Sequence, residues 1–349
     1  MKAARQFRRP SRSCNAVLAL GVLVAAGTGR AAAAAAPSPE TFTYKTVGPM
    51  EIEADVYRPA QATGRSPVLV YLHGGSLING GREKFAQHPF REWFPAAGFA
   101  VVSIDYRLAP ETKLAGIVED LEDAVRWVRR DGPRLFGADP DRIAVAGGSA
   151  GGYLTLVAGY RVKPRPFALV AEMSYGDLVG PWQMRPSIHP PHYQTHLTAE
   201  EAWSQVSGPP IANARERRGD GSAFNDFLRR NALWPKAVSG WDPVAETDKY
   251  LPYLPLRNVT PDYPPTFFIH GHDDTDVPRE QPEMMAAELQ RNGVEHRLTL
   301  LPHGEHGYRG ADPRLVEYAQ HQAFEFVLRH LPALGTPSSK PPADNTPSP

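Results

Sequence analysis

The sequence predicts an α/β fold in which a mostly parallel, doubly wound sheet carries helices on both faces. Short, continuous apolar runs such as Pro67-Val68-Leu69-Val70-Tyr71-Leu72 recur along the chain and suit strands that are buried on both sides. Between them lie stretches such as 117–128 in which apolar residues recur at helical spacing. Alternating strand and helix signals are typical of a parallel sheet, and 349 residues suffice for one large domain with an insertion.

Each predicted element follows from a local pattern. Residues 41–57 alternate loosely between polar and apolar around Val47-Gly48, which predicts an opening antiparallel pair of strands. A helix over 283–290 is stopped by Gly293. Further buried strands are predicted at 67–72, 99–104, 142–146, 167–173, 265–269 and 296–301, and further helices at 117–128, after Ser149 and at 314–331.

A serine between glycines follows one of these strands directly, in Gly147-Gly148-Ser149-Ala150-Gly151-Gly152. This is the G-x-S-x-G pattern, in which a serine is held in a tight strand-to-helix turn. Glycines there let backbones approach closely, and the hydroxyl lies at the positive end of a helix. The pattern predicts Ser149 as a nucleophile, although a glycine-rich turn with an incidental serine explains the six residues alone equally well.

A second glycine motif follows the strand at 67–72, in His73-Gly74-Gly75-Ser76. Small residues at this place leave backbone N–H groups free to point at a substrate oxygen. Acyl transfer passes through a tetrahedral oxyanion that such donors stabilise. We therefore assign Gly74 and Gly75, together with the N–H of Ala150, to an oxyanion hole.

The last two predicted strands each end in a loop rich in ionisable residues. The first loop carries Asp273, Asp274 and Asp276, and the second carries His303 and His306. A serine hydroxyl needs a base to take its proton, and that base needs an acid to orient it. The order serine, aspartate, histidine along the chain is one that such triads use. The residues alone leave three acids and two bases in competition.

Together these segments resemble the α/β-hydrolases of the hormone-sensitive-lipase-like carboxylesterase group. The resemblance covers residues 67–308. The matching motifs are His73-Gly74-Gly75, Asp105-Tyr106-Arg107-Leu108-Ala109-Pro110-Glu111, Asp139-Pro140-Asp141-Arg142-Ile143, Gly147-Gly148-Ser149-Ala150-Gly151-Gly152, the H-G-x-x-D-x-x-V-P run from His270 to Pro278, and His306-Gly307-Tyr308.

The resemblance implies an α/β-hydrolase fold and selects the remaining triad members. Its H-G-x-x-D-x-x-V-P pattern falls on Asp274 as the acid, and its H-G-[FY] pattern falls on His306 as the base. Asp105 and Arg107 are expected to brace the oxyanion loop. The chain departs from the family pattern at two places, Ser76 in place of a third glycine and Gly148 in place of an acidic residue. Neither departure removes a catalytic group.

The resemblance further implies a serine hydrolase that cleaves carboxylic esters through an acyl-enzyme and needs no cofactor. The expected substrate is a small-molecule, carbohydrate or lipid ester, with its acyl length and alcohol left open. A secreted serine exopeptidase of the prolyl-oligopeptidase kind, a non-catalytic binding module on the same fold, and acyl transfer to an acceptor other than water remain as alternatives.

The first 36 residues have the organisation of a cleavable signal peptide. Basic residues from Lys2 to Arg12 precede an apolar stretch, Ala16 to Ala26, and then the alanines Ala31–Ala36, where cleavage is expected. An apolar stretch of 11 residues is short of the roughly 20 that a membrane-spanning helix needs. We therefore expect a secreted or periplasmic protein without a stable membrane anchor.

Removing this leader changes the balance of charge and thiols. The only cysteine, Cys14, is removed with it, so that the mature chain has no disulfide. The six basic residues of the leader leave 32 basic and 38 acidic residues behind, a net charge of −6. Nothing in this balance favours nucleic acid. The domain is expected over 37–334, with a disordered tail over 335–349.

The alternation of strands and helices lapses between Ser174 and Pro264, over about ninety residues. A structureless loop of that length is unusual inside a compact domain. We expect 174–264 to form a lid or cap over Ser149, with short helices near 199–206 and 224–233. Four tryptophans in it are expected to supply aromatic surface: Trp182, Trp203, Trp234 and Trp241.

Three histidines of this segment, His189, His192 and His196, suggest metal ligands at first sight. Pro190-Pro191 interrupts any common helical face, and no clustered carboxylates accompany them. We therefore predict no metal site.

Overall fold

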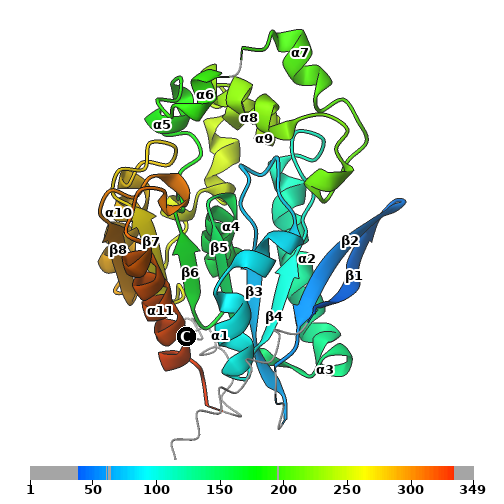
Figure 1. The fold of residues 1–349 in the computed structure, drawn as a ribbon, viewed down its shortest axis with the longest axis vertical. Coiled ribbons are helices and arrows are strands. Elements are labelled where there is room, and N and C mark those ends of the chain that lie inside the picture. Colours follow the sequence, from blue (N-terminus) through cyan, green and yellow to red (C-terminus); the bar gives the residue numbers. More distant parts are fainter. Residues whose placement is uncertain (1–37, 60, 62–63, 195, 334–349) are drawn as a thin grey trace, which may run out of the picture. The chain divides into compact units, whose positions relative to one another are not determined.

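The computed structural model describes residues 38–59, 61, 64–194 and 196–333. This part of the chain contains an eight-stranded sheet in the order β1-β2-β4-β3-β5-β6-β7-β8 (Figure 1). Strands β3 to β8 pair in parallel, whereas β2 pairs antiparallel with both β1 and β4. The predicted mostly parallel sheet is confirmed. The strands are β1 (Glu40–Val47), β2 (Met50–Tyr57), β3 (Ser66–Leu72), β4 (Ala100–Ile104), β5 (Ala138–Gly148), β6 (Leu169–Glu172), β7 (Thr266–Gly271) and β8 (His296–Leu301).

Helices cover both faces of the sheet because side chains of a strand point alternately to either side. On β3, Val68, Val70 and Leu72 join the core beneath α2 (Leu114–Arg130), α4 (Ala150–Arg161) and α10 (Glu280–Arg291). Leu69 and Tyr71 join a second core beneath α1 (Phe90–Ala96) and α11 (Pro313–Arg329). The short α3 (Gly132–Leu135) packs against β5. The continuous apolar run of β3 thus serves two cores at once.

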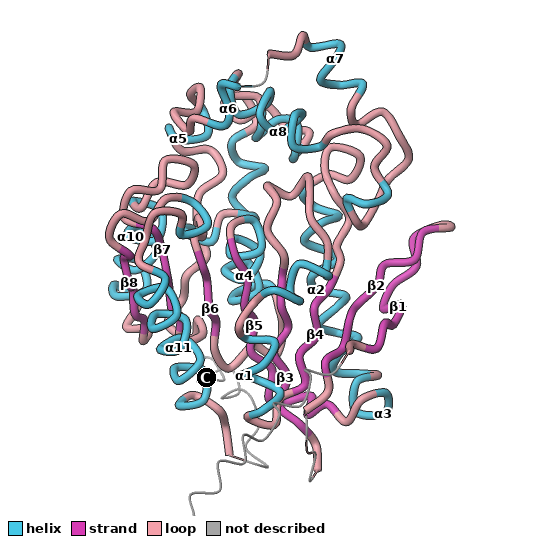
Figure 2. Tube along the Cα trace, in the orientation of Figure 1, coloured by secondary structure: helices cyan, strands magenta, loops and turns pink. Residues whose placement is uncertain are grey.

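Between β6 and β7 the described residues form only helices and loops, and the helices from residue 181 to 239 lie beyond the carboxyl ends of the parallel strands (Figures 1 and 2). We call residues 174–264 the insertion segment. Its predicted helices are present, although the second runs three residues earlier than expected at both ends because Asp220 caps it. The helices are α5 (Pro181–Met184), α6 (Pro191–Gln194), α7 (Ala199–Ser204), α8 (Gly221–Arg230), α9 (Trp234–Ser239), η2 (Ala214–Glu216), η3 (Thr247–Tyr253) and η4 (Pro255–Arg257).

The expectation that all four tryptophans of this segment supply surface was wrong for Trp234. Trp203 is 45% exposed, but Trp234 is only 2% exposed. The Trp234 indole N–H donates a hydrogen bond to the Ser76 carbonyl at 3.1 Å. This ring therefore fixes the insertion segment to the loop after β3.

The predicted leader (1–36) and tail (335–349) lie outside the described residues. Within the described ranges, no helix combines the length and the apolar character needed to cross a membrane.

Candidate active site

Ser149 occupies the turn between β5, which ends at Gly148, and α4, which begins at Ala150. Its backbone has φ 57° and ψ −120°, a conformation that a residue with a side chain rarely adopts. The Ser149 N–H donates to the carbonyl of Glu172 at 2.9 Å, which holds the turn against β6. Strain of this kind persists where the surrounding structure enforces it, often at functional sites.

The glycines of the turn are required by close backbone contacts. A Cβ atom on Gly151 would lie 2.0 Å from the Leu72 carbonyl oxygen, and one on Gly147 would lie 2.6 Å from it. Both distances are shorter than any side chain tolerates. The end of β3 and the serine turn therefore pack backbone against backbone, which brings the loop after β3 beside Ser149.

The structure joins Ser149, His306 and Asp274 in one chain of hydrogen bonds. Ser149 Oγ lies 3.0 Å from His306 Nε2, and His306 Nδ1 lies 2.8 Å from Asp274 Oδ2. The other oxygen of Asp274 accepts hydrogen bonds from the backbone N–H groups of Asp276 and Val277, at 3.0 and 2.9 Å. These bonds fix the carboxylate, and the carboxylate fixes the imidazole.

Electrostatics favour the charged form of this histidine. Burial by itself lowers the pKa of His306, but the hydrogen bond to Asp274 and the negative charges of Asp276 and Asp274 outweigh it. The net result is a pKa raised above the ordinary value. A base that holds its proton more firmly accepts one from a serine hydroxyl more readily.

The competing candidates of the two loops lie elsewhere. The His303 side chain is 86% exposed, and its Nδ1 atom faces Asp273 at 3.7 Å. Asp273 is itself 52% exposed, whereas the Asp274 side chain is fully buried. Asp276 lies close, with one oxygen 3.9 Å from His306 Nε2. The structure thus brings one acid and one base to Ser149 and places a second carboxylate beside them.

The proposed oxyanion donors lie next to the serine. A Cβ atom on Gly74 would lie 3.2 Å from Ser149 Cβ, so the loop after β3 lies directly against Ser149. Gly75, at φ 131°, starts a tight turn whose carbonyl accepts from Ile78 and Asn79. Among the described residues, the N–H groups of Gly74 and Gly75 donate to no backbone carbonyl. The Ala150 N–H belongs to the first turn of α4, where helices leave donors unpaired.

Comparison with known proteins places this chain in a family. Residues 69–309 match a family model described as the alpha/beta hydrolase fold. The chain belongs to this family. The resemblance to hormone-sensitive-lipase-like α/β-hydrolases drawn from the motifs is thereby confirmed.

Solved structures share the fold of this α/β-hydrolase. Esterase 2 of Thermogutta terrifontis, phosphoramylated by tabun, aligns with a TM-score of 0.58 at 22% identity, over 87% of this chain and 98% of that one. The apo form of the same esterase aligns with a TM-score of 0.56 at 24% identity, over 85% and 97% of the two chains.

Curated relatives of this α/β-hydrolase include much longer proteins. A non-reducing polyketide synthase of Stachybotrys bisbyi is 27% identical over 332 residues, 84% of this chain and 15% of that protein. Another, of Penicillium brevicompactum, is 29% identical over 370 residues, 90% of this chain and 17% of that protein. The chain therefore spans less than a fifth of the length of these relatives.

The residues that support the loop after β3, which carries the proposed oxyanion donors Gly74 and Gly75, differ in part from those expected. The Tyr106 ring stacks on His73 with centroids 4.2 Å apart, and its hydroxyl donates to the His73 carbonyl at 2.7 Å. Asp105 accepts from the Arg82 N–H at 2.7 Å, at the far end of the loop. Arg107 instead binds Asp120 on α2, so its expected bracing role was wrong. Tyr106, which lies between Asp105 and Arg107 in the sequence, is the residue that contacts His73 of this loop directly.

A buried carboxylate behind the serine turn escaped the sequence reasoning. Glu172 lies 2.8 Å from His88 Nε2 and accepts from Tyr308 Oη at 3.1 Å and Gln320 Nε2 at 3.2 Å. Burial raises the pKa of Glu172, but the charge and hydrogen bond of His88 outweigh it, so the pKa is lowered. His88 lies just before α1, Tyr308 lies in the short helix η5 (His306–Tyr308) and Gln320 lies in α11. No local pattern in the sequence links these segments.

The three histidines of the insertion segment lie within hydrogen-bond distance of hydroxyl groups and of an arginine. His189 and His192 direct their Nδ1 atoms at the hydroxyls of Thr275 and Ser187, at 2.8 and 2.7 Å. His196 lies 2.8 Å from an Arg230 nitrogen. Over the residues that the structure describes, no group of three or more His, Cys, Asp or Glu is arranged to hold a metal ion.

Proposed function

We propose that this α/β-hydrolase is an exported serine esterase that cleaves carboxylic esters through an acyl-enzyme. The hydrogen-bonded chain from Ser149 Oγ through His306 to Asp274, at 3.0 and 2.8 Å, carries the proposal. The esterase activity named for the solved neighbours, whose fold this chain shares, supports it. The activity of the whole polyketide synthases is not transferred, because the chain matches only a small part of them.

The mechanism follows from the positions of the groups. Ser149 Oγ adds to the ester carbonyl carbon while His306 Nε2 takes its proton, and Asp274 stabilises the imidazolium that forms. The carbonyl oxygen becomes an oxyanion that the N–H groups of Gly74, Gly75 and Ala150 stabilise. When the tetrahedral intermediate collapses, the alcohol leaves with the proton of His306. The same histidine then deprotonates a water molecule that attacks the acyl-enzyme and releases the acid.

Short acyl chains are the first substrates to examine. The Thermogutta esterase was solved with butyrate bound and with propionate bound. We propose that this chain likewise accepts short acyl groups on a small-molecule, carbohydrate or lipid alcohol. It acts without nucleic acid or a stable membrane anchor.

The test compares the mature protein with Ser149→Ala on p-nitrophenyl esters from acetate to laurate. We expect turnover that depends on chain length and falls by roughly 10⁴–10⁶-fold in the variant. Because the solved neighbour was phosphorylated by paraoxon, paraoxon should also add one diethylphosphoryl group to Ser149, seen by mass spectrometry. A folded wild type that neither turns over these esters nor takes up the label contradicts the proposal, and turnover of peptide substrates instead indicates the exopeptidase.

Export is the second part of the proposal and has its own measurement. The chain expressed with residues 1–36 in a secreting bacterial host should appear in the periplasm or medium. Its N-terminus, determined by sequencing, should begin within or just after Ala31–Ala36. A full-length protein retained in the cytoplasm would exclude this leader.

A further inference from the structure

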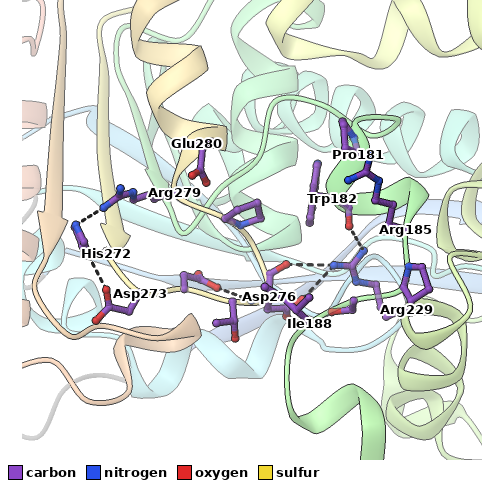
Figure 3. A pocket seen from close by; sticks show the side chains of 15 residues that line it. Pro181, Trp182, Arg185, Ile188, Arg229, His272, Asp273, Asp276, Arg279 and Glu280 are labelled. Carbon is purple, nitrogen blue, oxygen red and sulfur yellow. Dashed lines mark hydrogen bonds and ion pairs between the residues drawn. The ribbon is translucent and has the colours of Figure 1, made fainter.

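A cavity of about 490 Å³ lies beside the triad, between the insertion segment and the loop after β7 (Figure 3). The insertion segment contributes Pro181, Trp182, residues 185–188 and Arg229, and the segment after β7 contributes residues 272–276 and 278–280. Asp274 and Asp276 belong to the lining, so the cavity reaches the acid side of the triad. The established family membership assigns no ligand to it.

Asp276 connects this cavity to the reacting atoms. One of its oxygens lies 3.9 Å from His306 Nε2, which lies 3.0 Å from Ser149 Oγ. The side chains of Asp276 and His306 are 19% and 18% exposed, so both are accessible to a ligand. Asp276 therefore forms part of the cavity wall and also flanks the nitrogen that faces the nucleophile.

The Asp276 carboxylate is held in its charged form by the groups around it. Arg229 donates to its backbone carbonyl at 3.2 Å and approaches its other carboxylate oxygen at 3.7 Å. His192 Nε2 lies 3.8 Å from the same oxygen. Burial raises the pKa of Asp276, but the charges of His306, Arg229, His192 and His189 outweigh it and lower the pKa. In the part of the chain that the structure describes, the oxygen that faces His306 accepts no hydrogen bond and can accept one from a ligand.

The alcohol portion of an ester must pass this carboxylate. His306 gives its proton to the departing oxygen, which must come within about 3 Å of Nε2. The carbon atoms attached to that oxygen then lie beside Asp276. An apolar group there would desolvate a buried charge, whereas a hydroxyl would donate a charge-assisted hydrogen bond to it.

The remaining lining favours neutral polar groups over ions. Two arginines, Arg185 and Arg279, and two acids, Asp273 and Glu280, line the cavity (Figure 3). In the described part of the chain Arg185 has no hydrogen-bond or ion-pair partner and is free to bind a ligand. With both signs of charge present, neither an anion nor a cation is favoured throughout. A hydroxyl group suits such a lining because it both donates and accepts.

We propose that this cavity binds the alcohol portion of a polyhydroxylated ester, and that Asp276 accepts a hydrogen bond from the hydroxyl next to the scissile oxygen. The inference rests on the proposed esterase function and names its substrate class. Asp276 is thereby a specificity residue, distinct from the acid Asp274.

The decisive experiment uses two esters of equal size, 2-hydroxyethyl butyrate and propyl butyrate, with p-nitrophenyl butyrate as a general substrate. At one fixed pH we expect kcat/KM of the wild type to favour the hydroxylated ester by about tenfold. This measurement on the wild type requires no variant. If the ratio of kcat/KM for 2-hydroxyethyl butyrate to that for propyl butyrate is one or less, the inference is wrong but the esterase function stands. If none of the three esters is turned over, the proposed function itself is contradicted.

Asp276→Asn then tests the residue, with Asp262→Asn as its matched control. Asp262 is 70% exposed and lies outside the cavity. The preference should fall to about threefold or less in Asp276→Asn, because a neutral acceptor binds more weakly than a carboxylate. It should remain at the wild-type ratio in the control. Any change in the basicity of His306 affects both esters equally, so an unchanged ratio in a folded Asp276→Asn contradicts the assignment.

Two further measurements identify the alcohol. A glycerol monobutyrate and a methyl glucoside 6-butyrate distinguish a three-carbon polyol from a sugar, and Arg185→Gln should raise KM severalfold for whichever is preferred. Butyrylcholine tests whether the cavity prefers a cation, since its alcohol portion carries a positive charge and has no hydrogen-bond donor. If its kcat/KM exceeds that of 2-hydroxyethyl butyrate, the cavity is a cation site and the inference is wrong.

Discussion

His306 lies between two carboxylates with different partners. Asp274 binds its Nδ1 atom at 2.8 Å and is itself held by two backbone N–H groups. Asp276 approaches the other nitrogen at 3.9 Å and is balanced by Arg229. At the scale of single residues, the first carboxylate orients the base and the second adds to its charge environment. Both raise the pKa of His306 against the opposing effect of burial.

The pH dependence of activity tests this arrangement. His306 must be neutral to act as a base, so kcat/KM should fall as pH decreases through its pKa. Since that pKa is raised, the midpoint should lie above the ordinary value of about 6.5. Asp276→Asn removes one negative charge and should move the midpoint to lower pH, whereas Asp262→Asn should not move it. A midpoint unchanged by Asp276→Asn would contradict the electrostatic role.

At the scale of elements, Ser149 is positioned by the β5–turn–α4 unit, which packs on the end of β3. Its contacts run from backbone to backbone, as at Gly151 and Leu72. Gly148 differs from its neighbours, because a Cβ atom there would meet nothing closer than 3.9 Å. A methyl group at this position would therefore fit in ordinary van der Waals contact.

A pair of alanine variants separates these positions. Gly151→Ala should destabilise the protein by about 3 kcal/mol, the upper range of overpacking, because backbone atoms cannot move aside. Gly148→Ala should change stability by less than about 1 kcal/mol. Thermal unfolding followed by circular dichroism measures both. Equal melting temperatures for the two variants would contradict the close contact between the backbones of Leu72 and Gly151.

Across the whole molecule, the insertion segment is tied to the sheet domain by buried polar contacts. Arg217 forms an ion pair with Glu111, and their side chains are only 3% and 6% exposed. Arg217 also donates to the carbonyls of Ile78 and Ala109, at 3.1 and 3.2 Å. The Trp234 bond to Ser76 adds a second tie at the oxyanion loop. These contacts hold the proposed cap against the loop that carries the proposed oxyanion donors, Gly74 and Gly75.

Arg217→Ala should therefore cost about 3–5 kcal/mol of unfolding free energy, since it leaves Glu111 buried and unpaired. Arg215→Ala is the matched control two residues away. Its side chain is 73% exposed and pairs with Glu83 at 3.0 Å, an exposed pair worth about 1 kcal/mol or less. Urea unfolding measures both variants. Similar losses for the two would argue against a buried tie between insertion segment and domain.

Much of the site follows from the sequence because its parts are local. The serine turn and the loop with Gly74 and Gly75 each consist of consecutive residues after an apolar strand. Their conformations depend on glycine and on the strand before them, so a short pattern contains the information. The order of strands and helices is equally local, which is why the parallel sheet was predicted correctly.

The choice of one acid and one base among the neighbouring aspartates and histidines could not be made from local sequence patterns alone. By itself the sequence determined the fold class, the serine turn and the two loops that carry the candidate acids and bases, since each depends on periodicity or on glycine within a few residues. Only the tertiary structure decided that His303 faces solvent, that Asp276 lies against His306, that Glu172 binds His88 and that Trp234 is buried. These facts depend on segments up to 158 residues apart. Packing alone brings such segments together, because solvent access and charge pairing are properties of the folded chain.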